Sequence, residues 1–138
     1  MEPFHLSLIT TDLPAQRRFY VEVLGCSPAR VGPDFADFDF FGHQLTFHQR
    51  AEGLRLGFET LHFGAVIAEP LFQDLRARLE QAGVPFVVAP QQQAQGTPDA
   101  RWKMVFLDPS AYAIELKCYT DPSRLLASAA AYPRVRSR

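Results

Sequence analysis

Two stretches of the chain show the same succession of strand-like and helix-like patterns. The first opens with loose alternation of apolar and polar residues over 4–9, which predicts a strand. Apolar i,i+4 pairs then predict a helix that ends at Gly25. Residues 37–41 and 43–48 alternate again and predict two more strands. A polar connector over 49–59, where no periodicity remains, separates this stretch from the next.

The second stretch repeats the order. Residues 61–67 predict a strand, and a helix follows from Pro70 to Gly83. The core face of this helix is predicted from its i,i+4,i+8 leucines, which are Leu71, Leu75 and Leu79. A short strand is predicted at 84–88 and a long polar loop at 90–100. Two final strands are predicted at 102–107 and 112–119.

The repeat predicts the fold class. Each half reads β-α-β-β with room for one further strand, and neither half alone can enclose a core. We therefore expect an α+β protein in which two βαβββ modules form a curved mixed-sheet cup, with the helices on the outside. The expected domain spans 1–127, with module one at 1–50 and module two at 58–120. Residues 128–138 are expected to form a flexible tail.

Candidate metal ligands occupy matching places in the two modules. His5 and His62 each lie in the first strand of their module. Strand alternation places each of them opposite an apolar stripe that must pack on the helices, and it does the same for Glu115 in the last strand. The three side chains can therefore converge on the concave face. Two imidazoles and one carboxylate suit a divalent ion with open positions, as in non-haem iron(II) sites.

The fourth strand offers two further candidates. Gln44 shares a face with His48 and is placed for a fourth ligand, because its position in module one corresponds to Glu115 in module two. His48 is the nearest candidate for a catalytic acid or base, although an isolated histidine at a strand end is more often a surface residue. His43 faces the apolar side and is expected to be structural.

The alternative is that the three candidate ligands are ordinary residues. A single histidine on a strand is usually structural, and a glutamate near a strand end is usually solvated. No local motif such as HExxH supports the ligands, which are far apart in sequence. The recurrence of histidine at the same place in both modules is what favours a site.

Composition narrows the classes of function. The chain has 138 residues, 47% of them apolar, and a net charge of -1. This balance does not favour nucleic acid or an anionic membrane as a partner, and the apolar runs are too short to span a bilayer. Cys26 and Cys118 lie among apolar residues and are expected to be reduced, structural thiols. Without a recognisable signal segment, a cytoplasmic protein is expected.

The chain also resembles the vicinal oxygen chelate superfamily, which includes glyoxalase I, extradiol dioxygenases and fosfomycin-resistance thiol transferases. The residues that carry the resemblance are Phe4-His5-Leu6, Asp12-Leu13, Phe19-Tyr20, Leu24-Gly25, His62-Phe63-Gly64, Phe106-Leu107-Asp108-Pro109 and Ile114-Glu115-Leu116-Lys117. Residues 37–45 and 108–110 resemble a bacterial subgroup of predicted extradiol-dioxygenase-like glyoxalase family proteins.

The resemblance implies a metal held by His5, His62 and Glu115, with Gln44 where glyoxalase I has a fourth ligand. The sequence departs from the family pattern at two positions. Ala111 occupies a turn that usually contains glycine, and Gln44 is a weaker ligand than the glutamate common in bacterial glyoxalase I. No second catalytic base can be assigned.

Three functions remain open. The first is a dioxygenase-like enzyme that uses Fe(II), with Mn, Ni, Zn or Co as other possible ions. The second is a glyoxalase-like lyase or isomerase, and the third is an antibiotic-resistance transferase or binding protein on the same fold. The neutral Gln44 favours the oxygenase by a small margin. The expected partners are a small-molecule substrate and a second copy of the chain, with no nucleic acid and no membrane.

Overall fold

The protein is described here by a computed structural model, which covers residues 2–58 and 61–126. The tail predicted at 128–138 lies outside the described residues. Module one consists of β1 (His5–Thr10), α1 (Leu13–Arg18) with a π-helical continuation (Phe19–Val23), β2 (Ser27–Val31), β3 (Phe35–Phe40) and β4 (His43–Gln49). Module two consists of β5 (His62–Val66), α2 (Glu69–Gln81), β6 (Phe86–Gln93), β7 (Arg101–Leu107) and β8 (Ala113–Tyr119), followed by a 3-10 turn (Pro122–Leu126).

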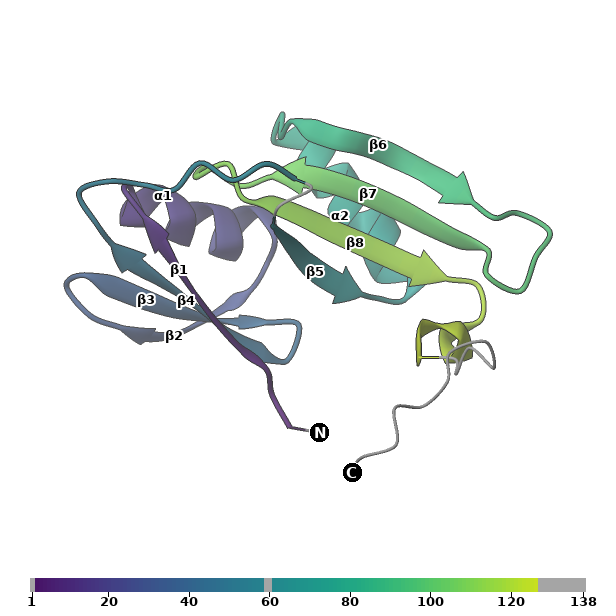
Figure 1. The fold of residues 1–138 in the computed structure, drawn as a ribbon, viewed down its shortest axis with the longest axis horizontal. Helices are drawn as coiled ribbons and strands as arrows, with labels where there is room; N and C mark the ends of the chain where they lie inside the picture. Colours follow the sequence, from purple (N-terminus) through teal and green to yellow (C-terminus); the bar gives the residue numbers. More distant parts are fainter. Residues whose placement is uncertain (1, 59–60, 127–138) are drawn as a thin grey trace, which may run out of the picture.

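Each module forms its own four-stranded mixed sheet. The strand orders are β1-β4-β3-β2 and β5-β8-β7-β6, and the β1/β4 and β5/β8 pairs are parallel. Figure 1 shows the two sheets side by side, with α2 covering one face of the second sheet. The predicted α+β fold with two βαβββ modules is confirmed.

Two strand predictions were incomplete. The strand β2 was not predicted, because every one of its residues is exposed and no apolar alternation marks it. The loop predicted at 90–100 was wrong at its start, since β6 runs on through Gln93 and pairs with β7. Both are edge strands, where proline and polar residues are tolerated because one side of the strand faces solvent.

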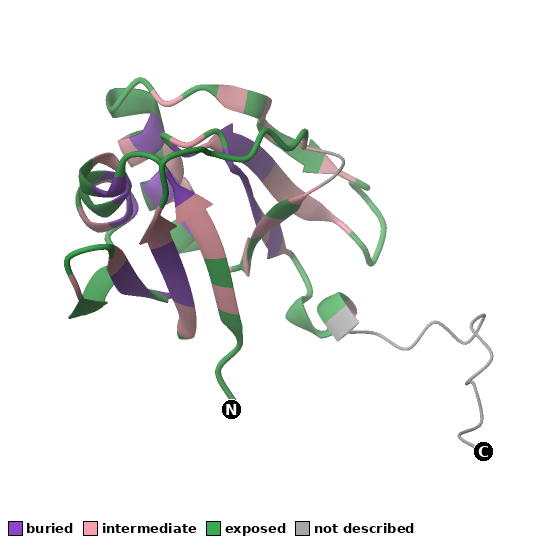
Figure 2. Cartoon of the chain, turned by 60° about the vertical axis from the view of Figure 1, so that its left-hand side comes forward, coloured by how far each residue is buried: buried purple, intermediate pink, exposed green. Residues whose placement is uncertain are grey.

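The core lies between the sheets and the helices. Figure 2 shows buried residues gathered on the inner strands, while loops and outer strands are exposed. On α2 the buried residues are Phe72, Leu75 and Leu79. Leu71, which was predicted to lie on the core face of this helix, is 41% exposed, and Phe72 is buried in its place. Large aromatic side chains continue this core into module one, where Tyr20, Phe38 and Phe47 are fully buried.

A buried carboxylate joins the two modules. Asp108, between β7 and β8, accepts hydrogen bonds from the Gln16 amide and the Tyr20 hydroxyl at 2.9 Å each. Its other oxygen accepts from the backbone N–H groups of Ser110 and Tyr112, also at 2.9 Å. Burial raises the pKa of the Asp108 carboxyl, and these hydrogen bonds hold back part of that rise. The angle between the modules therefore depends on contacts that span about ninety residues of sequence.

We predict that Asp108→Asn lowers the free energy of unfolding by about 3 kcal/mol, because an amide NH2 would face hydrogen-bond donors at a buried position. Chemical denaturation monitored by tryptophan fluorescence measures the change. Asp99→Asn is the matched control, because Asp99 is solvent-exposed and makes only a surface ion pair with Arg124. A loss below about 1 kcal/mol would show that apolar packing alone docks the modules.

Candidate metal centre

The face of the second sheet opposite α2 carries a polar cluster centred on Glu115. This residue lies on β8 between the core residues Ile114 and Leu116, so its side chain points away from the helix. Its carboxylate is largely shielded, with a side chain 10% exposed. His62 Nε2, from the neighbouring strand β5, lies 3.1 Å from Glu115 Oε2. The predicted proximity of His62 and Glu115 is therefore present in the structure.

The second ring nitrogen of His62 is held by the backbone. His62 Nδ1 lies 2.8 Å from the carbonyl oxygen of Phe58, which can only accept a hydrogen bond. Nδ1 therefore carries the hydrogen, and in the neutral ring Nε2 presents a lone pair. The Phe58 ring also lies against the imidazole, with 4.6 Å between ring centroids. A ring nitrogen anchored in this way is typical of metal-binding histidines.

The pair of acceptors needs a cation. The Nε2 lone pair and Glu115 Oε2 face each other at 3.1 Å, which is unfavourable unless a proton or a metal ion is shared. Neighbouring donors at about 2.1 Å from an octahedral ion lie roughly 3 Å apart. The donor types and their separation therefore fit one divalent metal at this place.

Two lysines surround the other oxygen of the carboxylate. Lys103 Nζ on β7 lies 3.2 Å from Glu115 Oε1, and Lys117 Nζ on β8 lies 3.9 Å from the same oxygen. Both lysine contacts are to Oε1, whereas His62 contacts Oε2. A cavity of about 290 Å³ adjoins this cluster and is lined by His62, Glu115, Lys117 and residues 63–66 of β5.

A glycine lets the two ligand strands approach each other. Gly64 pairs with Glu115 in the parallel β5/β8 ladder. A Cβ atom added to Gly64 would lie 1.6 Å from the carbonyl oxygen of Glu115. The glycine of the His62-Phe63-Gly64 segment is therefore required for the spacing of the strands that carry His62 and Glu115.

The remaining predicted ligands lie on the first sheet. His5 on β1 and Gln44 on β4 are direct neighbours in the parallel ladder. His5 is exposed, and Gln44 is half-buried. Within residues 2–58 and 61–126, no three His, Cys, Asp or Glu side chains gather into a possible metal site. The structure thus brings together His62 and Glu115 within one chain, and it does not bring His5 to them.

The sequence did not single out Asp37 as the centre of the polar face of module one. This residue is fully buried and accepts hydrogen bonds from Thr46 Oγ1 at 2.7 Å, Arg30 Nε at 2.8 Å and Gln44 Nε2 at 3.2 Å. Burial acts to raise the pKa of Asp37, but the hydrogen bonds and the Arg30 charge outweigh it and leave the pKa below its ordinary value. Because the Gln44 NH2 group donates to Asp37, its Oε1 remains available as an acceptor or ligand.

The other histidines of module one have different surroundings. His48 is half-buried on β4, with its ring 6.2 Å from that of Phe35. His43 Nδ1 accepts a hydrogen bond from the backbone N–H of Phe4 at 2.7 Å, in keeping with its predicted structural role. Among the described residues, none of the ion pairs gives His48 an acidic partner that would orient it for proton transfer. Its catalytic role stays a prediction.

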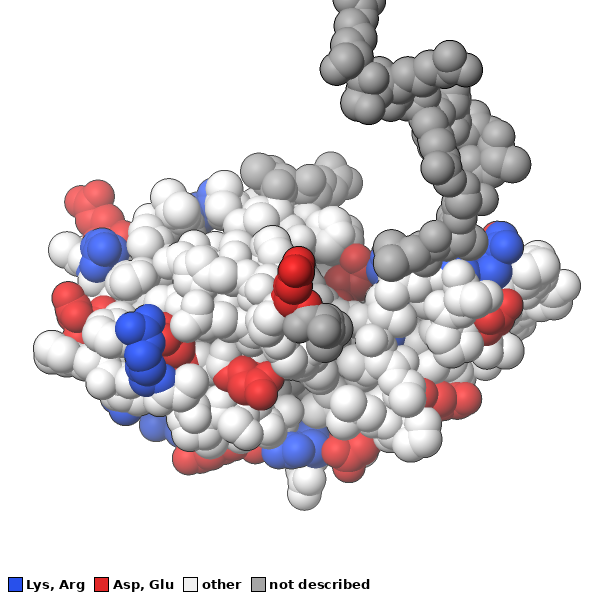
Figure 3. Space-filling model, turned by 90° about the horizontal axis from the view of Figure 1, so that it is seen from below, with Lys and Arg blue, Asp and Glu red and all other residues white. Residues whose placement is uncertain are grey.

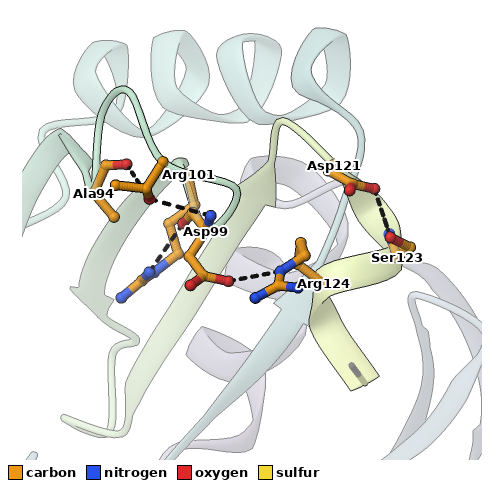
Figure 4. Close-up of polar contacts among 7 residues, drawn as sticks. Ala94, Asp99, Arg101, Asp121, Ser123 and Arg124 are labelled. Carbon is orange, nitrogen blue, oxygen red and sulfur yellow. Dashed lines mark hydrogen bonds and ion pairs between the residues drawn. The ribbon is translucent and has the colours of Figure 1, made fainter. Parts of the chain in front are cut away.

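A second cavity and an exposed group of charges lie away from the cluster centred on Glu115. A cavity of about 710 Å³ lies between the connector at 53–57 and the turn at 109–112, and Arg55 is its one ionisable lining residue other than Tyr112. Figure 4 shows an exposed set of polar contacts in which Arg124 pairs with Asp99. Figure 3 shows acidic and basic side chains interspersed on one face, with no patch of a single sign. These features are those of an ordinary solvated surface.

Comparison with known proteins places the chain in a family. A family model described as the Glyoxalase/Bleomycin resistance protein/Dioxygenase superfamily matches residues 3–116. The chain belongs to this superfamily. Its members generally bind small molecules and divalent metals. No curated protein matches the chain.

Solved structures of this superfamily are similar over nearly the whole chain. A glyoxalase/bleomycin resistance protein/dioxygenase from Alicyclobacillus acidocaldarius shares 31% identity with a TM-score of 0.78, covering 91% of this chain and 96% of that one. The fosfomycin resistance protein FosX from Listeria monocytogenes shares 18% identity with a TM-score of 0.72, covering 91% and 98%. A glyoxalase/dioxygenase from Nostoc punctiforme shares 18% identity with a TM-score of 0.70, covering 87% and 92%. The last two support the fold alone.

Among the described residues, none of the helices is both long enough and apolar enough to cross a membrane.

Proposed function

We propose that this chain is a metal-dependent enzyme that binds one divalent ion through His62, Glu115 and His5. The observation that carries the proposal is the contact between His62 Nε2 and Glu115 Oε2 at 3.1 Å. The backbone of Phe58 fixes the tautomer that leaves Nε2 free to bind a metal. The small cavity beside the pair provides space for a small substrate.

A second copy of the chain supplies His5 in this proposal. Each chain offers one ligand pair on module two, and the candidates His5 and Gln44 on module one. In a two-fold symmetric dimer, module one of each copy meets module two of the other, so two equivalent sites arise. The edge strands β1 and β5 carry His5 and His62 and leave one side unpaired by the other described strands. Phe4 and Val66 beside them are exposed apolar residues, at 63% and 36%, suited to such an interface.

The favoured reaction is of the extradiol dioxygenase type. His5, His62 and Glu115 would hold an iron(II) ion, which would supply Lewis acidity toward the two vicinal oxygens of the substrate. The residues of the chain orient the ion: Phe58 holds His62 through its backbone carbonyl, and Lys103 holds Oε1 of Glu115. His48 lies on the same face of β4 as Gln44 and is the proposed proton carrier.

A glyoxalase-type isomerase is the second candidate, and the orientation of Gln44 favours it. Because Asp37 accepts from the Gln44 NH2 group, the carbonyl oxygen of the amide is left for a metal. A site with Gln44 bound would have four protein ligands, as a nickel or zinc isomerase requires. The two candidates therefore differ in whether Gln44 is a ligand.

The test separates the two reactions by their need for oxygen. Protein purified without air is loaded with iron(II) or with nickel, and both forms are assayed with a panel of catechols and with a hemithioacetal. Oxygen uptake by the iron(II) form alone, lost on air oxidation, is the expected result. Oxygen-independent turnover of the hemithioacetal by the nickel form, with no oxygen uptake on any catechol, would establish the isomerase instead.

Substitutions of Gln44 test its role as a ligand. We expect Gln44→Ala to weaken metal affinity by about tenfold if the amide is bound, because one ligand is lost. Gln44→Glu should hold the metal at least as tightly but lower the stability of the metal-free protein, because a second carboxylate would face Asp37. Calorimetric titration with zinc and thermal unfolding with and without metal measure both effects. Unchanged zinc affinity in Gln44→Ala would assign the amide to the support of Asp37 alone.

A further inference from the structure

An excess of positive charge surrounds the carboxylate of Glu115. Lys103 on β7 and Lys117 on β8 are direct partners in the antiparallel ladder, so two like charges lie opposite each other on one face of the sheet. Like charges at such positions destabilise a sheet. Glu115 is the one carboxylate that pairs with them among the described residues. A bound divalent ion would add further positive charge at the same carboxylate.

The two lysines differ in how firmly they are engaged. Lys103 Nζ is 3.2 Å from Glu115 Oε1, close enough for a charge-assisted contact. Lys117 Nζ is 3.9 Å from the same atom, which is too long for a hydrogen bond. Its side chain is 32% exposed and donates no hydrogen bond to any other described residue. The ammonium group of Lys117 can therefore donate hydrogen bonds to a ligand, whereas that of Lys103 already contacts Glu115.

The position of Lys117 connects it to the substrate cavity. Lys117 lines the 290 Å³ cavity together with His62 and Glu115, and Lys103 does not line it. Arg101, on the same face of β7, is turned elsewhere: its guanidinium lies 5.8 Å from the Tyr119 ring centroid and donates to the backbone of Asp99. Lys117 is therefore the one lysine or arginine that lines this cavity.

We propose that Lys117 selects a substrate that carries an oxoanion, such as a carboxylate or phosphonate, beside the two oxygens that chelate the metal. Lys103 acts as a positioning residue that neutralises and orients Glu115. This inference rests on the metal-dependent function proposed above and adds the charge class of the substrate. An ammonium group in a partly buried cavity contributes specificity for charge, because a bound anion can accept the hydrogen bonds that the long contact with Glu115 leaves unused.

The experiment uses two catechols that offer the same pair of vicinal oxygens and differ in charge. The protein is loaded with zinc, which does not react with oxygen, and titrated with 3,4-dihydroxybenzoate and with 4-methylcatechol. We expect the wild type to bind the carboxylate about tenfold more tightly. Lys117→Gln should lose about tenfold for the anionic probe and less than about twofold for the neutral one. Lys117→Arg should keep the preference, because it keeps the charge.

The controls separate charge recognition from folding and from metal loss. Arg76→Gln removes a cation on α2, where Arg76 pairs with Glu80 on the far side of the sheet, and should change neither probe. Thermal unfolding of Lys117→Gln should occur at the wild-type temperature or above it, because a like-charge pair is removed. If the protein takes up zinc but binds both probes equally, the inference about Lys117 is wrong and the metal site stands. The same holds if Lys117→Gln weakens the binding of both probes equally. Failure of the wild type to take up zinc overturns the metal site and this inference together.

Discussion

A mixture of two inactive variants is expected to regain metal binding. His5→Ala and Glu115→Ala should each lose affinity for zinc by more than about a hundredfold, because each removes a ligand from both sites of the dimer. In a mixed dimer, one site combines the two defects and the other has a complete set of ligands. With random assortment, half of the dimers are mixed, so about a quarter of the wild-type zinc content should return. Elemental analysis after co-refolding of the two variants measures this fraction.

A second pair of variants provides the control. His62→Ala and Glu115→Ala both remove ligands from module two, so every site in their mixed dimers keeps one defect. This mixture should recover no zinc. Different affinity tags on the two chains show that mixed dimers have formed. If such dimers form from His5→Ala and Glu115→Ala and still hold no zinc, His5 does not complete the site across the dimer.

The sequence predicted the elements whose side chains alternate between core and solvent. The strands β1, β3, β4, β7 and β8 were recognised because one face packs on a helix. The strand β2 escaped recognition because both of its faces are exposed. The polar end of β6 was mistaken for a loop, since Gln91 to Gln93 carry no apolar signal. Pairing with a neighbouring strand defines such edges, and local sequence does not record it.

The candidate site was predictable only within a module. Alternation correctly placed Glu115 opposite the core residues of β8, and the matching register of β5 brought His62 to it. The distance of His5 from this pair depends on how the modules dock. Docking is set by long-range contacts such as those of Tyr20 and Asp108, which no periodicity in the sequence reveals. The role of Asp37 was missed for a similar reason, because its three donors come from two other strands, with Arg30 on β2 and Gln44 and Thr46 on β4.

The spacing of β5 and β8 leads to a prediction about Gly64. We expect Gly64→Ala to lower the free energy of unfolding by more than about 3 kcal/mol, beyond the usual cost of an extra methyl group in a packed region. The added Cβ would lie 1.6 Å from the Glu115 carbonyl oxygen and 2.9 Å from its backbone nitrogen. Backbone atoms in a ladder cannot move aside as a flexible side chain can, so β5 must shift away from β8. Urea denaturation of the metal-free protein measures the loss.

The same shift should disturb the metal centre. Moving β5 carries His62 away from Glu115, so zinc affinity in Gly64→Ala should fall even under conditions where the variant is folded. Gly57→Ala is the matched control, because no atom lies within 4 Å of a Cβ at that position and its φ is not positive. That variant should retain both stability and zinc affinity. A folded Gly64→Ala protein with wild-type zinc affinity would show that the contact between β5 and β8 does not set the geometry of the His62 and Glu115 pair.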